Sequence, residues 1–461
     1  MKKLLLIVLM LTFVSSIVLS GCGTDSETST EDTPTDTAED KTKDEPVILD
    51  EADKQEPVTL TLRHTQIGEG KQSRLVLLED AVADAESKLE HVTFELEAVD
   101  HEVNRFDKLP AEMAAGNQPD IFDLFGGTDT IRYAKADRLL PLNSILDELG
   151  LTDQFIELGE FTVDGEIYGL PIGGFTEGYF YSKPIFEELS VEPPTTWAEL
   201  ENIATKSKEA GYVPFAMAAQ GAWVPMMTMN TLVGHSAGPD SIQGLIDGTH
   251  KWTDPEIVNA FEVLQDFVAK DYFKQGSLGL DYGEQRNQLI TGEAVMMFDG
   301  SWTSSVFTDP EQAGDMLGDV GYFGMPGVPN GVGDQTAVNA GFSNGYGFSS
   351  SIADDENKLT AVKQFIQSMY NEEMQKRGLI EDNVIPSMKV SNLSGVDPLM
   401  SEIIEVMNSA GGAFPAIDGV VQAEVNTILG EGIQRILGDD VDPLEMLEEV
   451  QQIQEKANQE Q

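Results

Sequence analysis

The sequence predicts an α/β fold with at least two lobes, and three observations support this prediction. Residues 57–461 exceed the roughly 250–300 residues at which a single hydrophobic core stops growing. Apolar residues form 41% of the chain, which is enough for more than one core. Near the start of this region, stretches with an apolar residue at every second position alternate with helical stretches. This order is typical of a mostly parallel sheet with right-handed crossovers.

Five successive segments predict the first sheet. Apolar residues at every second position indicate strands, and apolar residues three or four apart indicate helices. In chain order the segments are strand 58–62, helix 75–89, strand 92–98, helix 111–115 and strand 121–125. Ligands of such sheets gather at the carboxyl ends of the strands. The loops after two of these ends, 65–69 and 126–129, are therefore the first places to expect a binding site.

Three later helices are predicted by their own local signals. Apolar stripes indicate helices over 257–268 and 359–369. A third helix is expected to begin after Thr196, because Glu199 three residues further on completes a capping box.

The N-terminus carries a targeting signal. Lys2 and Lys3 precede an apolar run over residues 4–19, and residues 19–22 resemble the bacterial lipobox, which ends in Cys22. The resemblance implies a signal peptide over 1–21 and a lipid on Cys22, which would hold the protein at the extracellular face of the cell membrane. An uncleaved membrane helix over the apolar run is the alternative. Residues 22–56 are acidic and poor in large apolar side chains, so we expect the lipidated cysteine to be followed by a disordered linker.

Composition narrows the classes of partner. The net charge of −52 argues against nucleic acid and anionic lipid as partners held by long-range attraction. Cys22 is the only cysteine, so once it carries lipid no thiolate remains for a disulfide or a metal site. The five histidines lack zinc-site spacing, and residues 439–442 lack the glycine and glutamate of a calcium loop. We therefore expect no metal and no cofactor.

Short segments in a fixed order run along nearly the whole globular part. They are residues 114–116 with 119–121, 139–142, 164–171, 179–183, 193–197, and 292–297 with 300–302. Their order and spacing resemble the maltose-binding-protein-like family 1 of extracellular solute-binding proteins, which serve carbohydrate ABC importers. The chain departs from the family pattern at residues 181–184, where Tyr-Ser-Lys-Pro replaces the usual Tyr-Asn-Lys-Asp.

The resemblance implies a periplasmic-binding-protein-like fold of two lobes, each a mostly parallel sheet flanked by helices, with the ligand cleft between them. It implies lobe 1 over 57–174 and 325–375, and lobe 2 over 175–324 and 376–461. Glycines at 173, 174, 324 and 327 fit hinges for closure around the ligand. The expected protein is a monomeric receptor, not an enzyme, that delivers a sugar or oligosaccharide to the permease subunits of an ABC transporter in the membrane.

A sugar offers apolar faces for stacking and hydroxyl groups for hydrogen bonding, so its site needs aromatic rings and fixed polar groups. The resemblance places Trp302 and Trp223 among the sugar-facing aromatic residues, whereas Trp252 is expected to be structural. The remaining candidates follow strand ends, lie at the crossovers or belong to a late loop. They are Thr65, Gln66, Glu69, Gly126, Gly127, Thr128, Phe175, Asn344, Tyr346 and Phe414, with Gly126, Gly127 and Thr128 expected to offer backbone amides.

Other functions stay open at the level of sequence. A secreted surface glycoside hydrolase could use paired carboxylates, for example Asp281 with Glu284 or Glu293 with Asp299. A binding protein for a non-sugar neutral solute, or a surface scaffold without a small ligand, would also suit an extracellular lipoprotein. The sequence does not identify the sugar or its length.

Overall fold

The structure is a computed structural model that describes residues 56–68 and 71–459. The expected signal peptide, the lipidation site Cys22 and the candidate Glu69 lie outside these residues. Within the described ranges, no helix has both the length and the hydropathy needed to cross a bilayer.

The first sheet forms as the sequence predicts. Strand β1 (Val58–His64) pairs in parallel with β2 (Val92–Ala98) and with β3 (Ile121–Phe125). Helices α1 (Gln72–Lys88) and α2 (Leu109–Ala115) provide the crossovers. The predicted parallel βαβαβ unit is therefore confirmed, and we call the part built on it lobe 1.

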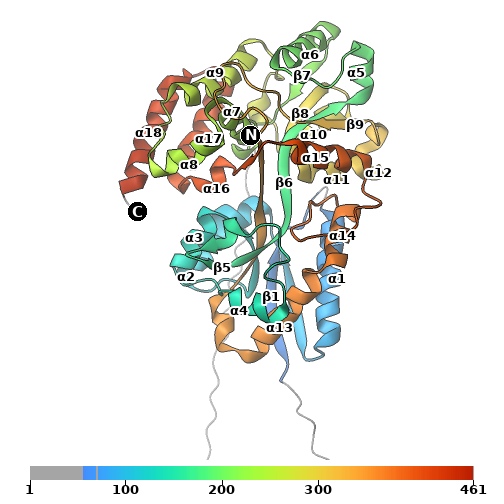
Figure 1. Ribbon diagram of the computed structural model, residues 1–461, viewed down its shortest axis with the longest axis vertical. Helices are drawn as coiled ribbons and strands as arrows, with labels where there is room; N and C mark the ends of the chain where they lie inside the picture. Colours follow the sequence, from blue (N-terminus) through green and yellow to red (C-terminus); the bar gives the residue numbers. More distant parts are fainter. Residues whose placement is uncertain (1–55, 69–70, 460–461) are drawn as a thin grey trace, which may run out of the picture. The chain divides into compact units, whose positions relative to one another are not determined.

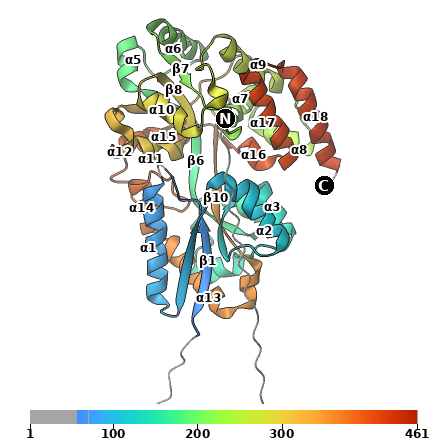
Figure 2. The same ribbon diagram turned by 180° about the vertical axis from the view of Figure 1, so that it is seen from behind.

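Two long strands connect lobe 1 to a second sheet, whose part of the molecule we call lobe 2. Strand β6 (Gly169–Ser182) pairs near its start with β10 (Val338–Phe348), and its end pairs with β8 (Ala294–Gly300) and β9 (Val320–Phe323). Strand β10 begins beside β11 (Ala413–Phe414) and ends beside β3. The main path of the sheet has the order β2-β1-β3-β10-β6-β8-β7 and ends at β7 (Val213–Ala216). Strands β6 and β10 run through both lobes in Figures 1 and 2. Strand β6 is antiparallel to its neighbours, and β10 is antiparallel to β3 and β6 but parallel to β11, so the sheet is mixed at the junction.

Helices cover the sheet of each lobe and complete the two-lobe α/β fold that the resemblance implies (Figure 1). The other elements of lobe 1 are the π-helix η1 (Val103–Lys108), α3 (Thr128–Lys135), α4 (Asn143–Leu149), β4 (Thr162–Val163), β5 (Glu166–Ile167), α13 (Glu356–Met369) and α14 (Glu372–Glu381). Lobe 2 contains α5 (Lys183–Leu189), α6 (Trp197–Ala210), β7 (Val213–Ala216), α7 (Trp223–Ala237), α8 (Pro239–Asp247), α9 (Pro255–Ala269), α10 (Tyr282–Ile290), β8 (Ala294–Gly300), α11 (Ser304–Thr308), α12 (Pro310–Ala313), β9 (Val320–Phe323), α15 (Pro398–Ser409), β11 (Ala413–Phe414), α16 (Ile417–Val420), α17 (Ala423–Leu437) and α18 (Pro443–Gln459).

Each lobe has its own core, as expected for a chain of this length. In lobe 1, Phe94, Phe365 and Tyr346 pack between the sheet and α13. In lobe 2, Trp252 and Phe261 are fully buried, and α9 buries the apolar stripe that predicts it. The predicted capping box of Thr196 and Glu199 is also present at the start of α6.

The expected limits between the lobes stay predictions, and two elements bear on them. Strand β10 still pairs with β11 of lobe 2 at Val338 and Asn339, beyond the expected limit at 324/325. Helix α14 continues across the expected limit at 375/376. At the first crossover, a Cβ atom on Gly173 would lie 2.1 Å from the Val384 side chain, so glycine permits the close approach of residues 384–385 to β6.

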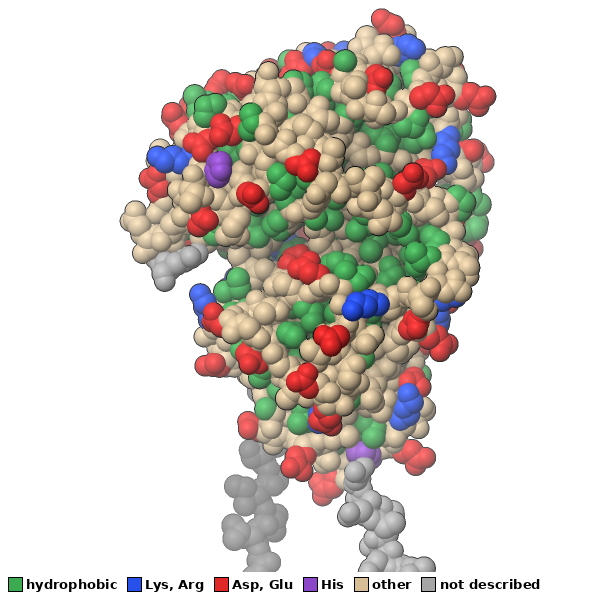
Figure 3. Space-filling model, viewed as in Figure 1, with side chains coloured by type: hydrophobic (Ala, Val, Ile, Leu, Met, Phe, Trp, Pro, Cys, Tyr) green, Lys and Arg blue, Asp and Glu red, His purple; other side chains and the backbone are tan. Residues whose placement is uncertain are grey.

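Acidic side chains are spread over both lobes. On the face seen in Figure 3, Asp and Glu side chains are scattered and greatly outnumber the basic ones. This distribution agrees with a hydrated, self-repelling surface and offers no single acidic patch on that face.

Candidate ligand-binding cleft

Four aromatic rings form a connected group on lobe 2, which we call the aromatic platform: Phe175, Trp223, Tyr282 and Trp302. The rings of Trp223 and Tyr282 meet edge to face, with centroids 4.7 Å apart. Trp302 Nε1 donates a hydrogen bond to the Tyr282 hydroxyl oxygen at 2.7 Å. The Trp302 ring also packs against Phe175, with centroids 5.7 Å apart. The platform thus joins the start of α7, the start of α10, the turn after β8 and the crossing strand β6.

A buried carboxyl group holds the platform in place. The Tyr282 hydroxyl donates to Asp299 Oδ1 at 2.7 Å, and the Gly300 backbone N–H donates to the same oxygen at 2.7 Å. Burial raises the pKa of Asp299 to about 7. A Cβ atom on Gly300 would lie 2.1 Å from the Trp302 ring, so only glycine leaves room for the indole there. Trp302, Tyr282 and Asp299 therefore form a hydrogen-bonded chain that fixes two rings of the platform.

A polar group lies at the carboxyl ends of the lobe 1 strands, around Asp123. Thr65 Oγ1 donates to Asp123 Oδ2 at 2.8 Å, and Asn344 Nδ2 donates to Asp123 Oδ1 at 3.1 Å. Burial raises the pKa of Asp123 above its ordinary value. Lys71 Nζ donates to the Thr65 carbonyl oxygen at 3.0 Å. We call these four residues, with Gln66, the polar cluster, and the Gln66 Oε1 atom is buried there without a hydrogen-bond partner in the described chain.

The lobes meet beside these two groups. Arg105 of η1 lies over the Phe125 ring, 3.4 Å from its centroid, and forms an ion pair with Asp418 of α16 at 3.1 Å. Trp223 Nε1 donates to Glu102 Oε1 at 2.6 Å. A pocket of about 360 Å³ opens here, and residues of both lobes line it, among them Glu102, Trp223 and Asp418. Of the platform and the polar cluster, only Trp223 lines this pocket. We call the lobe junction where the platform, the polar cluster and these contacts lie the interlobe cleft.

Two predicted backbone donors are engaged within the protein. The Gly126 N–H donates to the Ser343 carbonyl oxygen, and the Gly127 N–H donates to the Glu160 carbonyl oxygen, both at 2.7 Å. The expectation that these amides face a ligand is therefore not met. Gly127 has another role, because a Cβ atom on it would lie 2.1 Å from the Gly419 carbonyl oxygen of lobe 2. Thr128, the first residue of α3, is partly exposed beside this contact.

Two predicted cleft residues lie in cores instead. The Tyr346 side chain is 1% exposed and packs against Phe365 in lobe 1. Phe414 is 2% exposed and packs so closely on α7 that a Cβ atom on Gly234 would lie 2.4 Å from its ring. Both residues fill hydrophobic space, so we leave them out of the proposed site.

The sequence reasoning missed several residues that shape the cleft. Tyr282, Arg286 and Arg105 were not singled out, and Asp299 was considered only as one of a catalytic pair. Arg105 and Asp418 are 313 residues apart in sequence, and no local pattern links them. Of these residues, only Tyr282 could have been placed from the sequence, as the first residue of a helix, because it directly follows the capping residue Asp281 of α10.

The carboxylate pairs considered for glycoside hydrolysis have structural partners. Asp281 and Glu284 form the capping box of α10, each accepting the backbone N–H of the other. Glu293 forms an ion pair with Lys274 at 2.6 Å, whereas Asp299 is buried beneath Tyr282. These contacts account for the four residues without a catalytic role.

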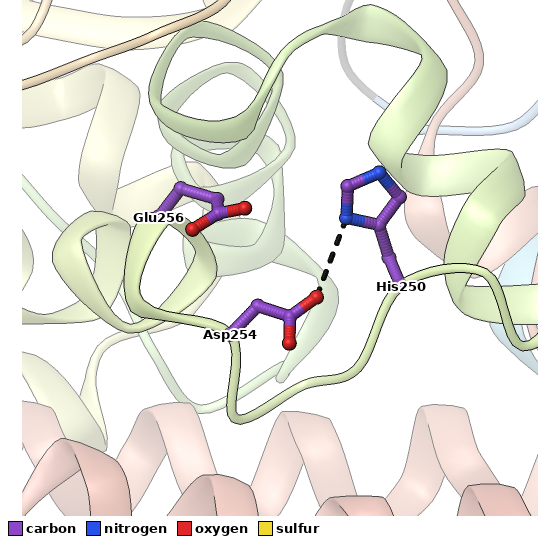
Figure 4. Close-up of side chains that lie close together, drawn as sticks. All are labelled: His250, Asp254 and Glu256. Carbon is purple, nitrogen blue, oxygen red and sulfur yellow. Dashed lines mark ion pairs between the residues drawn. The ribbon is translucent and has the colours of Figure 1, made fainter.

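One group of possible metal ligands occurs in residues 56–68 and 71–459, at the start of α9 (Figure 4). It consists of His250, Asp254 and Glu256, whose ligand atoms lie within 4.8 Å of one another. His250 Nδ1 is 3.4 Å from Asp254 Oδ2, and this oxygen also accepts the Lys251 backbone N–H. The contacts stabilise the loop before the helix, and none of the three residues belongs to the platform or the polar cluster.

The fold and the cleft define a two-lobe binding protein with an aromatic and polar site at the lobe junction. A family model described as bacterial extracellular solute-binding protein matches residues 79–376. The chain belongs to this family.

Individual relatives agree with this family. An uncharacterised ABC transporter extracellular-binding protein of Pyrococcus horikoshii is 26% identical over 72% of this chain and 70% of its own length. A multiple sugar-binding protein of Streptococcus mutans is 22% identical over 70% of this chain and 79% of its own length. A solved structure described as a chitin oligosaccharide binding protein is 46% identical, with a TM-score of 0.82 over 87% of this chain and 99% of that one.

Proposed function

We propose that this protein is the lipid-anchored binding component of a bacterial ABC importer and that its ligand is an oligosaccharide of the chitin class. The observation that carries the proposal is the aromatic platform, which is fixed by Asp299 and bounded on the other lobe by the polar cluster. The 46% identity to a chitin oligosaccharide binding protein supports this class of ligand.

The cleft residues suit the chemistry of a sugar. Flat rings offer stacking surfaces for the apolar faces of pyranose units, and polar side chains satisfy the hydroxyl groups. We assign stacking to Trp223, Trp302, Tyr282 and Phe175. Hydrogen bonding falls to the side chains of Thr65, Gln66, Asn344 and Thr128.

Ligand binding would favour closure of the cleft. A ligand shifts a conformational equilibrium only by its difference in affinity for the two states. An oligosaccharide that touches the platform and the polar cluster at once gains both sets of contacts only when the lobes are close. The crossing strands β6 and β10 connect the lobes, so small backbone rotations in them would suffice for the movement.

Anchoring and delivery rest on the N-terminal sequence and on the family. Lipidation of Cys22, followed by the acidic linker, would hold the globular part outside the cell within reach of a permease in the membrane. A Cys22→Ala variant should lose its partition with membranes. Full retention in the membrane fraction would instead favour an uncleaved N-terminal helix.

A thermal-shift screen tests the binding function. Tetra-N-acetylchitotetraose should raise the melting temperature of the purified protein, and mass spectrometry should recover the oligosaccharide unchanged. Release of shorter sugars would favour a glycoside hydrolase. A shift with a non-sugar neutral solute alone would change the ligand class, and no shift with any solute would favour a scaffold.

A further inference from the structure

Arg286 is the one arginine of the described chain with neither an ion pair nor a hydrogen bond. It lies on α10, one helical turn after Tyr282, and its guanidinium is 4.4 Å from the centroid of the Tyr282 ring. Its Nε atom is buried and has no hydrogen-bond partner. The other arginines in residues 56–68 and 71–459 are all paired with carboxylates or a backbone carbonyl: Arg63, Arg74, Arg105, Arg132, Arg138, Arg377 and Arg435.

A shortage of carboxylates does not explain this unpaired guanidinium. The sequence contains 80 acidic residues against 28 basic ones, so a pairing partner is easily supplied. Leaving a buried donor unsatisfied costs free energy, and the cost is larger for a charged group. The stacking on Tyr282 fixes the guanidinium as part of the platform, and no N–H group of Arg286 has a hydrogen-bond partner in the described chain. This arrangement is expected of a residue whose partner is the ligand.

A second cation lies on the opposite lobe. Lys71 belongs to the polar cluster, where its ammonium donates to the Thr65 carbonyl oxygen. Burial lowers the pKa of Lys71, and the nearby charges of Arg74 and Arg286 lower it further.

The chemistry of the two cations selects the group that they can bind. Arginine and lysine side chains donate hydrogen bonds and accept none, so their partner must be an acceptor, such as an amide carbonyl or a carboxylate. A net charge of −52 repels an anionic ligand at long range. The net charge therefore favours the neutral amide carbonyl over the carboxylate.

We propose that Arg286 is a specificity-determining residue that recognises the acetamido carbonyl oxygen of an N-acetylated sugar ring. The inference rests on the proposed oligosaccharide-binding function and adds the residue that distinguishes an acetamido group from a hydroxyl.

Calorimetric titration of the full chain tests this inference with two neutral probes, tetra-N-acetylchitotetraose and cellotetraose. The second has a hydroxyl in place of each acetamido group. We expect wild-type protein to prefer the acetylated sugar by about tenfold or more, because a charged hydrogen bond is lost with cellotetraose. Arg286→Gln should weaken binding of the acetylated sugar by a similar factor and change cellotetraose binding less than about twofold.

Matched variants separate specificity from folding. Arg435→Gln removes a guanidinium that pairs with Glu449 between α17 and α18, and it should leave both affinities unchanged. Arg286→Lys keeps the charge but loses the planar fork, so it should regain only part of the preference. Melting curves of the variants without ligand check that each one folds. If Arg286→Gln does not fold, the affinities of Arg286→Lys for the two sugars provide the test.

The outcomes distinguish this inference from the proposed function. If wild-type protein binds neither sugar, this inference is overturned, and the oligosaccharide function fails as well if no other oligosaccharide binds. If it binds sugar but Arg286→Gln keeps the preference, or loses both sugars equally, Arg286 does not determine specificity. Tighter binding of tetragalacturonate than of the acetylated sugar would overturn the choice of a neutral carbonyl.

Discussion

Arg105 of lobe 1 and Asp418 of lobe 2 form an ion pair of 3.1 Å across the interlobe cleft. Their side chains are 9% and 16% exposed, and Arg105 Nη2 also donates to the Asp418 backbone carbonyl oxygen at 3.2 Å. Asp129 and the Phe125 ring hold the guanidinium from within lobe 1. The pair can therefore form only when the lobes are close, and this electrostatic contact should stabilise the closed cleft.

Replacing Asp418 with asparagine should shift the protein towards a more open state. The change removes the charge but leaves Arg105 in contact with Asp129 and Phe125. A partly exposed ion pair contributes about 1 kcal/mol, so ligand affinity should fall by roughly fivefold. Small-angle scattering of the ligand-free variant should give a larger radius of gyration than wild type. Asp240→Asn, an exposed change on α8, should alter neither quantity.

Truncating Trp302 should weaken binding without unfolding the protein. Trp302→Ala removes the ring between Phe175 and Tyr282 and should cost about 1–3 kcal/mol of binding free energy, as loss of an aromatic anchor commonly does. Titration calorimetry with tetra-N-acetylchitotetraose measures the loss. Trp252→Phe is the matched control, because Trp252 is fully buried in the lobe 2 core and should affect stability alone. An unchanged affinity for Trp302→Ala would remove this residue from the site.

In contrast to Trp302→Ala, Tyr346→Ala should lower the stability of the protein and leave its ligand affinity nearly unchanged. The side chain is fully enclosed between the lobe 1 sheet and α13, so its removal leaves a cavity and should cost about 3–5 kcal/mol of unfolding free energy. Urea unfolding measures this cost, and titration of the folded variant should give nearly wild-type affinity. A large loss of affinity with little loss of stability would return Tyr346 to the cleft.

Stability should fall as the pH rises through neutrality, and Asp299 should be one cause. Burial raises its pKa from the ordinary 3.8 to about 7, so between these values the native protein binds more protons than the unfolded chain. The contribution of Asp299 to the free energy of unfolding is fully present below pH 4. It is lost as the pH rises to about 7, at no more than about 1.4 kcal/mol per pH unit. Burial raises the pKa of Glu160, also to about 7, with the same sign.

Asp299→Asn tests this origin, because the amide resembles the protonated acid. Urea unfolding at pH 5 and pH 8 in high salt should give a smaller difference for the variant than for wild type. The exposed change Asp354→Asn should keep the wild-type difference. Equal pH dependence in wild type and Asp299→Asn would refute the assignment.

Local patterns were sufficient to predict the fold of lobe 1 and many helices. In a strand or helix, the spacing of apolar residues shows which face is buried. This spacing predicted the strands over 58–62 and 92–98 and helix α9. The capping box at Thr196 was predictable for the same reason. The same pattern at Asp281 and Glu284 was considered only as an example of a carboxylate pair for the alternative glycoside hydrolase, although its spacing already fits a helix start.

The residues of the cleft were harder to predict from the sequence, because no local pattern shows whether a strand residue lies at the cleft or in the core. Asn344 and Tyr346 are two residues apart on β10, yet Asn344 bonds Asp123 at the cleft while Tyr346 lies in the core. Two residues of strand move a side chain by about 7 Å, which is enough to carry it beneath α13. The contacts of Tyr282 with Trp223 and Trp302 likewise arise only when three distant elements converge.

Titration calorimetry of the purified chain with tetra-N-acetylchitotetraose is the decisive test of oligosaccharide binding in the interlobe cleft. One oligosaccharide should bind saturably per protein and be recovered intact, and Trp302→Ala should diminish the heat of binding. Absence of binding to this and every other oligosaccharide, with the protein folded, would refute the proposed function.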